Sequence, residues 1–285
     1  MKKSIFENKK VLWTSLAMFG FMILFVAPIF FNVEEKSARR KINNLCYINL
    51  QKLGTSLLQY AKKEGKFPQH LSQLESNSTK FTSSPLNGAP YAYLASLNNN
   101  VPFNIPILVE HDALHVTRRG EKYGMVLSGD FKISYATEQL LSRYVRSMAK
   151  WQKIIQTNDA AQLFQKLNSE MQYRNDNITI NLLLWKLGEL KYKPAIPIMK
   201  KCQQYYNPAN SQIYSLARSI AFQANYSLYM LGENYNKKFM AQFLTSDNYF
   251  HRKKVWGMLK KQDEMLINTP ISPRHAQLYL DLQKK

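Results

Sequence analysis

The sequence predicts an α+β protein that begins with a transmembrane helix. Val11–Phe31 contains 21 residues without a charged side chain, and a bilayer core needs about 20 apolar residues in helical form. Residues 32–134 then combine one long helical pattern with short strand patterns, and residues 135–285 show helical patterns alone. We therefore expect a transmembrane helix that continues into a spine helix backed by a small antiparallel sheet, followed by an all-helical region.

The apolar stretch is expected to be an uncleaved signal anchor. A cleaved signal peptide has an apolar core of about 7–15 residues and a small-residue cleavage site, and Val26–Ile29 supplies no such site. Residues 1–10 form the leader. Four Lys or Arg residues flank the span on each side. The positive-inside rule, which compares these two counts, therefore does not decide the orientation. The short leader favours an N-terminus in the cytoplasm, with the later domains outside the cytoplasmic (inner) membrane.

The polar run from Asn32 to Leu58 is expected to continue the same helix. Residues 36–62 carry apolar side chains at the spacing of an amphipathic helix. Gly65 and Pro68 follow, as they follow many helix ends. The positions that step by three or four residues are Ile42, Leu45, Cys46, Leu50, Leu53, Leu57 and Ala61.

Short segments rich in β-branched and aromatic residues follow this helix and predict an antiparallel sheet. The last two of them are separated by the turn Ser128–Asp130, which predicts a hairpin. The expected strands are Tyr91–Leu94, Ile107–Glu110, Ala113–Val116, Gly124–Leu127 and Phe131–Ile133.

The region from Ala17 to Ile133 resembles the type IV pilin and pseudopilin (prepilin-like) family of bacterial envelope proteins. The resemblance implies a spine helix packed on a small sheet, and a role like that of type II secretion pseudopilins. At Gly20-Phe21, the nearest match to a prepilin cleavage site, Phe25 stands where the family has glutamate, so the resemblance does not extend to processing or filament assembly. The matching positions are Arg39-Arg40, Cys46, Asn49-Leu50, Lys52-Leu53-Gly54, Leu57, Tyr60, Gly65, Phe67-Pro68 and Leu71.

Residues 135–285 are expected to form a short HEAT-like helical array. Leu187-Gly188-Glu189 recurs as Leu231-Gly232-Glu233 after 44 residues, inside the span of about 40–47 residues of HEAT-type helical pairs. An ordinary helical bundle with a chance tripeptide match is the alternative. The helical segments are Thr137–Ile155, Asn181–Leu190, Pro194–Met199, Ala224–Glu233, Phe239–Leu244 and Val255–Lys260.

The net charge of +20 is concentrated in this helical region, where 22 Lys and Arg residues face 10 Asp and Glu residues. Such an excess favours an anionic partner, although a well-solvated lysine-rich surface has the same composition. The densest basic group is the candidate anion-binding site. Its alternative is the solvated face of a helix whose core side is Val255, Met258 and Leu259. The group is Arg252, Lys253, Lys254, Lys260 and Lys261, with His251 and Trp256 nearby.

The sequence predicts no catalytic, cofactor-binding or metal-binding residues. His111-Asp112-Ala113-Leu114-His115 has the outline of the zinc-protease helix motif, but its apolar flanks favour a strand and no third ligand stands out. Cys46 and Cys202 lie far apart in the sequence and predict neither a disulfide nor a metal site. Cys46 is expected to pack as a small apolar side chain.

These observations predict a non-catalytic, membrane-tethered scaffold or assembly protein, with the helical domain holding a protein partner. Its domains are the leader (1–10), the anchor (11–31), the pilin-like head (32–134) and the helical domain (135–285). The alternative is binding of an anionic polymer or surface, such as DNA or lipid headgroups, by the basic helical domain. The two differ in salt dependence, because neutralising phosphates makes binding steeply sensitive to salt.

Overall fold

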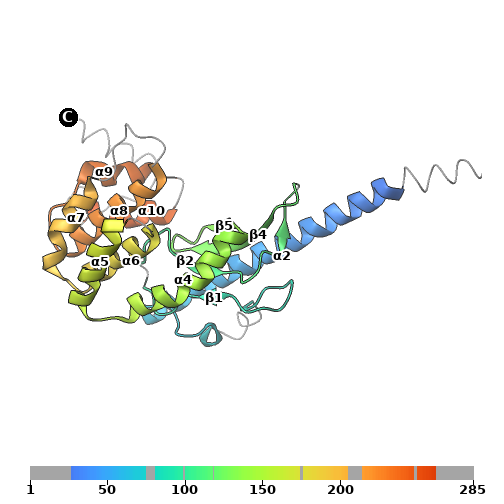
Figure 1. Cartoon of the computed structure of the whole chain (residues 1–285), viewed down its shortest axis with the longest axis horizontal. Coiled ribbons are helices and arrows are strands. Elements are labelled where there is room, and N and C mark those ends of the chain that lie inside the picture. Colours follow the sequence, from blue (N-terminus) through green and yellow to red (C-terminus); the bar gives the residue numbers. More distant parts are fainter. Residues whose placement is uncertain are drawn as a thin grey trace, which may run out of the picture. The chain divides into compact units, whose positions relative to one another are not determined.

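The computed structural model of the chain describes residues 27–74, 81–98, 100–117, 119–173, 176–204, 214–246 and 249–260. Internal contacts divide the chain into two compact units, residues 1–48 and 49–285. The boundary falls inside helix α2 (Ala27–Glu64), shown in blue in Figure 1. The second unit therefore holds both the sheet and the helices that follow it.

Helix α2 confirms the predicted helix after the apolar stretch, with one difference on its buried face. It is continuous over 38 residues. The side chains of Cys46, Leu50, Leu53, Leu57 and Ala61 are at most 1% exposed, whereas Leu45 is 57% exposed. Because adjacent residues lie about 100° apart around a helix, Leu45 cannot share the narrow face that holds its neighbour Cys46.

The predicted transmembrane helix is contradicted by the described part of the chain. Residues 11–26 of the expected span lie outside the described residues. Among the helices that are described, none combines the length and the apolar character needed to cross a bilayer. In α2 the reason is that charged residues begin at Glu34, three positions after Phe31. On this finding the predicted signal anchor and the single-pass inner-membrane localisation are wrong.

The predicted antiparallel sheet is present, and β4 is its central strand. β4 pairs with β2 and β3 and, separately, with β5, while β1 extends the sheet beyond β2. The strands are β1 (Ala92–Tyr93), β2 (Pro106–Val109), β3 (His115–Val116), β4 (Lys122–Ser128) and β5 (Ile133–Thr137).

Side chains cover β4 on both faces. A Cβ at Gly54 of α2 would lie 3.1 Å from Leu127 Cδ2, and a Cβ at Gly124 would lie 2.6 Å from Cδ2 of Leu141 in helix α4 (Glu138–Gln156). Gly124 and Leu127 are three residues apart on one strand, so their side-chain directions point to opposite faces. All four residues from Gly124 to Leu127 are buried. The strand is thus enclosed between two helices, and the glycines allow them to approach closely.

The turn after β4 lies later than predicted. β4 runs to Ser128 and β5 begins at Ile133, so Phe131, expected in a strand, lies in the turn with φ of 58°. Gly129 donates its N–H to Ile105 O at 2.8 Å. A Cβ at Gly129 would lie 2.2 Å from Pro102 O, a distance that no side chain can occupy. The turn is fixed by this backbone contact, which sequence spacing does not reveal.

Helices follow β5 as predicted (Figure 1). Thr137 ends β5 and caps α4, because its Oγ1 accepts the N–H of Leu140. α6 is buried all round from Thr179 to Leu184, and it contacts α4, α5 and α8. It is the central helix of this region. The helices after α4 are α5 (Ala160–Tyr173), α6 (Asn177–Glu189), α7 (Ile196–Gln203), α8 (Tyr214–Met230), α9 (Lys237–Ala241) and α10 (Tyr249–Lys260), with short 3-10 turns at Lys193–Ala195 and Gln242–Thr245.

The two Leu-Gly-Glu tripeptides do not occupy equivalent places. Gly188 is a helical residue of α6 whose missing Cβ would meet Met230 Cε at 2.6 Å. Gly232 lies past the end of α8 with φ of 77°. The residue with positive φ after α6 is Lys191. The HEAT-like organisation therefore remains a prediction that the tripeptide match does not support.

Hydrogen bonds tie the loop before β2 to the helices. Ala95 N donates to Gln152 Oε1 of α4 at 2.8 Å. Asn181 of α6 donates to Asn104 Oδ1 at 3.1 Å. Asn98 donates to the Glu189 carboxylate at the end of α6. These bonds join segments up to 91 residues apart, which explains why the sheet and the helices belong to one unit.

We expect Gly129→Ala to lower the free energy of unfolding by about 1–3 kcal/mol, because the added methyl group would displace the Pro102 carbonyl. Denaturant titration followed by circular dichroism measures the change. Gly257→Ala on α10 is the control, because nothing lies within 4 Å of its Cβ position. That substitution should raise stability by up to about 1 kcal/mol, since alanine favours helix. Equal destabilisation by both variants would contradict the role of the close contact between Gly129 and the Pro102 carbonyl.

Candidate functional site

The basic group predicted around α10 does not form one surface. Lys253 is exposed, whereas the guanidinium of Arg252 donates to the Ser246 carbonyl. Lys254 directs its ammonium group into the protein, where it donates to backbone carbonyls. The side chain of Lys260 and all of Lys261 lie outside the described residues.

The ammonium group of Lys254 is enclosed by rings and carbonyls. Nζ lies 4.6 Å from the ring centroid of Phe103 and 4.1 Å from that of Tyr226. It donates to Asn100 O at 2.8 Å and Val101 O at 3.1 Å. Both carbonyls belong to the loop before β2, so Lys254 attaches α10 to that loop. A cation held in this way is a structural contact and does not offer its charge to a ligand.

Burial lowers the pKa of Lys254 to about 7, and the nearby Glu189 carboxylate opposes this shift. The aromatic rings and the two carbonyls replace only part of the hydration that an ammonium ion has in water. Part of the side chain still reaches the surface, but the charged end does not.

A second group of cations lies along α4. Arg143, Arg146, Lys150 and Lys153 follow one another at intervals of three, four and three residues, the spacing of a single helix face. Arg143, Arg146 and Lys153 are exposed. We call these four residues, with Lys166 of α5, the α4 stripe.

Electrostatic interactions show that the two helices bring these cations together. Burial lowers the pKa of Lys166, and repulsion from Lys150 and Lys153 lowers it further, while Glu170 acts in the opposite direction. Lys150 Nζ pairs with Glu170 Oε1 at 2.7 Å and lies 3.7 Å from Asp176 Oδ2. Two acidic side chains therefore partly neutralise the centre of the stripe.

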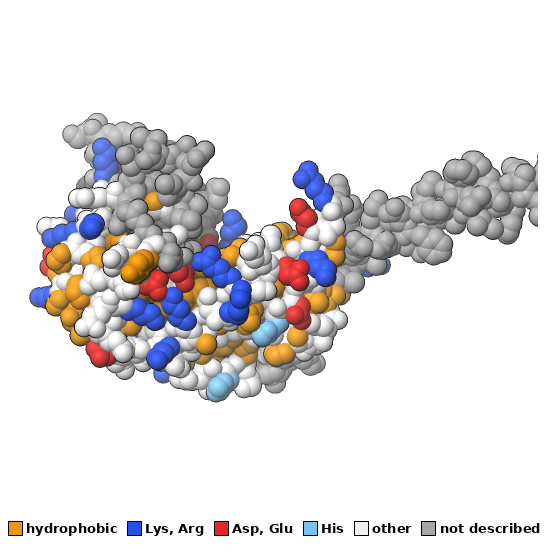
Figure 2. Space-filling model, viewed as in Figure 1, with side chains coloured by type: hydrophobic (Ala, Val, Ile, Leu, Met, Phe, Trp, Pro, Cys, Tyr) orange, Lys and Arg blue, Asp and Glu red, His pale blue; other side chains and the backbone are white. Residues whose placement is uncertain are grey.

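The exposed charge of the helical region is strongly one-sided. Among its described residues from 138 to 260, ten Lys or Arg side chains but only two acidic side chains are exposed. Figure 2 shows Lys and Arg gathered over the part of the surface where α4 lies in Figure 1. The exposed basic residues are Arg143, Arg146, Lys153, Lys191, Lys193, Lys200, Lys201, Lys237, Lys238 and Lys253, and the exposed acidic residues are Glu138 and Asp159.

Local contacts hold two further acidic side chains. Asp176 Oδ1 accepts the N–H groups of Ile178 and Thr179 and so caps α6. Glu189 accepts from Asn98 and pairs with Lys186 at 3.7 Å. Burial raises the pKa of Glu189, and Lys186 opposes this rise. Asp176 also lies 3.7 Å from Lys150, so these two carboxylates balance Lys150 and Lys186 and leave the exposed cations named above unbalanced by them.

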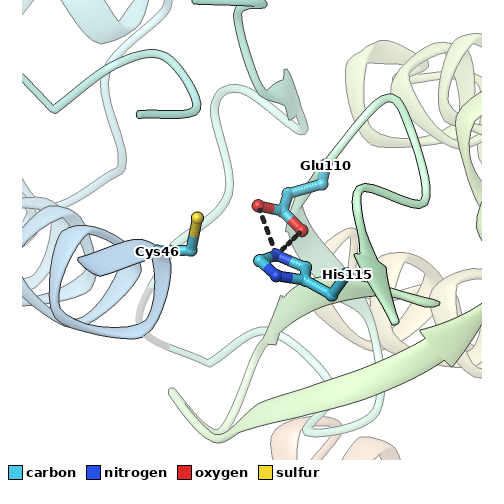
Figure 3. A group of neighbouring side chains, drawn as sticks. All are labelled: Cys46, Glu110 and His115. Carbon is cyan, nitrogen blue, oxygen red and sulfur yellow. Dashed lines mark hydrogen bonds and ion pairs between the residues drawn. The ribbon is translucent and has the colours of Figure 1, made fainter. Parts of the chain in front are cut away.

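A buried acid–imidazole pair lies beside the sheet. Glu110 and His115 have fully buried side chains, and His115 Nε2 lies 3.1 Å from Glu110 Oε2 (Figure 3). The same oxygen accepts the N–H of Met125 at 2.7 Å. The imidazole stacks on Tyr123 with a centroid distance of 5.2 Å. The Glu110 carboxylate thus has hydrogen-bond partners from the protein itself, His115 and Met125, where β2, β3 and β4 meet.

The zinc-protease outline at 111–115 does not assemble as one ligand pair. His111 is exposed in a bend, while His115 is buried in β3. Figure 3 draws Glu110 and His115 with Cys46, a buried cysteine of α2. Cys46 belongs to the first unit, and Glu110 and His115 belong to the second. Glu110 was not identified from the sequence, because a single buried acid after a strand has no distinguishing spacing.

The second cysteine is also enclosed. Cys202 Sγ lies 3.9 Å from Met171 Sδ. Burial raises its thiol pKa to about 12, and Lys201 counteracts this only in part. A thiol with so little thiolate at neutral pH is a poor nucleophile, so Cys202 is suited to packing and not to covalent chemistry.

Sequence inspection missed the α4 stripe although its signal was present. The spacing of Arg143, Arg146, Lys150 and Lys153 is visible on the polar side of the predicted helix Thr137–Ile155. Lys166 could not be added to it, because its place beside α4 depends on how α5 packs. Comparisons with protein-family models, curated proteins and solved structures find no match for this chain.

We expect Glu110→Ala to lower the free energy of unfolding by about 3 kcal/mol, because the His115 ring and the Met125 N–H would lose their buried acceptor. Urea titration measures the change. Glu121→Ala removes an exposed acid near the start of β4 and should change stability by no more than about 0.5 kcal/mol. An equally small effect of Glu110→Ala would show that the Glu110–His115 pair contributes little to the free energy of unfolding.

We expect stability to rise with pH between about 7 and 10, because the unfolded chain then binds a proton at Lys254 that the folded chain has released. Lys254→Met should remove about 1.4 kcal/mol per pH unit from the slope of unfolding free energy against pH in this range. Lys253→Met is the control, since this neighbouring side chain is exposed. An unchanged slope in the Lys254 variant would contradict the lowered pKa.

Proposed function

We propose that this chain is a non-catalytic binding protein whose helical region binds an anionic polymer. The observation that carries the proposal is the excess of exposed cations over exposed acids in the described part of residues 138–260. A surface with this imbalance attracts polyanions over several ångströms and gains free energy when bound counterions are released.

The type of exposed side chain favours this function over the predicted protein scaffold. Among the described residues from 138 to 260, Tyr173 is the one well-exposed large apolar side chain, at 64%. A protein-binding surface is expected to bury a central cluster of aromatic or aliphatic anchors. The exposed surface here supplies charge instead.

The buried state of the reactive side chains supports a non-catalytic role. The side chains of Glu110 and His115 have no exposed surface, and the pKa of the buried Cys202 is raised to about 12. Groups in this state are suited to holding the fold. The resemblance to pilins remains a prediction and is not required by this proposal.

The test is equilibrium binding of the full chain to fluorescent heparin and to a fluorescent DNA duplex, measured by anisotropy across a range of KCl concentrations. We expect binding at low salt, with log affinity falling linearly as log salt rises. Binding of neither probe at about 50 mM KCl, or affinity that does not depend on salt, would overturn the proposed function.

A further inference from the structure

We infer that the α4 stripe is a sequence-independent binding site for the phosphate backbone of duplex nucleic acid. This inference rests on the proposed function and names the surface and the class of polymer. It departs from the basic group predicted around α10, whose central lysine is enclosed by Phe103 and Tyr226.

The stripe has the shape of a line and not of a pocket. Arg143 and Lys153 are ten residues apart on one helix, which corresponds to about 15 Å. One strand of a duplex presents a phosphate about every 3.4 Å along the axis, so this length faces about four phosphates. A small anion would need cations that converge on one point.

The middle of the stripe argues against a single compact anion. Lys150 is already paired with Glu170 and lies near Asp176. Arg143 and Arg146 lie at one end of the stripe, and Lys153 with Lys166 at the other. A linear polyanion reaches both ends at once, which a compact anion cannot do.

The chemistry of α4 favours backbone contacts over base contacts. Its Trp151 is buried and donates Nε1–H to Thr179 Oγ1 at 3.1 Å. The ring of Tyr144 contacts the same indole in a tilted arrangement, with ring centroids 6.1 Å apart. Single-stranded nucleic acid is held chiefly by stacking of bases on aromatic rings, whereas Trp151 is enclosed and Tyr144 is half-buried. Contacts from Lys and Arg to phosphates carry no sequence information.

The test compares two variants of the full chain that lose the same charge. The stripe variant carries Arg143→Gln, Arg146→Gln and Lys153→Gln. The control carries Lys193→Gln, Lys200→Gln and Lys201→Gln, three other exposed positions. Anisotropy with a mixed-sequence DNA duplex should show at least about a tenfold loss of affinity in the stripe variant at about 100 mM KCl, and a salt slope smaller by about 2–3. The control should stay within about threefold of the unmodified chain.

Thermal unfolding shows whether each variant is folded. Arg143→Lys with Arg146→Lys keeps the charge and should keep both the affinity and the salt slope, so it tests the site even if the stripe variant unfolds. Loss of the slope in this variant would overturn the inference.

Three further outcomes separate the inference from the proposed function. Equal losses in the stripe and control variants would overturn the site and leave the proposed function standing. Tighter binding of heparin or single-stranded DNA than of the duplex would overturn duplex nucleic acid as the ligand class. Failure of the unmodified chain to bind any of these probes would overturn both proposals.

Discussion

The enclosure of β4 is the constraint on which the second unit depends. A strand that is buried on both faces needs apolar cover from two directions. Leu127 of β4 packs closely against Gly54 of α2, and Leu141 of α4 packs closely against Gly124 of β4. Since α4 supplies one of these covers, the first helix after the sheet is part of the core of the sheet. The later helices are joined to the sheet through α4, in agreement with their belonging to the same compact unit, residues 49–285.

This arrangement also determines which polar groups are removed from water. The loop before β2 lies against the helices and bonds to Gln152, Asn181 and Lys254. Each of these groups must find a partner inside, because an unpaired buried polar group costs free energy. The lowered pKa of Lys254 is the consequence for a cation that two rings and two carbonyls only partly solvate.

The surface charge follows from the same packing. Asp176 caps α6, and Glu189 pairs with Asn98 and Lys186. Many Lys and Arg side chains, by contrast, are exposed. Residues 135–285 hold 22 basic and 10 acidic residues, whereas ten basic and two acidic side chains are exposed in the described part of residues 138–260. The ratio of cations to acids is therefore higher at the surface than in the sequence. A protein with such a surface is well suited to binding a polyanion without any catalytic group.

The sequence by itself determined the order of the elements and whether each segment is a helix or a strand. Periodicity of 3.6 predicted α2 and α4, and β-rich segments between turns predicted the antiparallel sheet, because these signals are local. It did not determine that Leu45 would be exposed or that the turn would extend past Phe131. Only the tertiary structure decided the role of individual charged residues. Lys253 and Lys254 are neighbours in the same basic run, yet one is in solvent and the other lies between two aromatic rings. Lys166 joins the α4 stripe because the fold brings α5 to Lys150 of α4, as the Lys150–Glu170 ion pair shows. The contacts of Lys254 and Lys166 are made with residues that are distant in the sequence. Local spacing carries no information about such contacts.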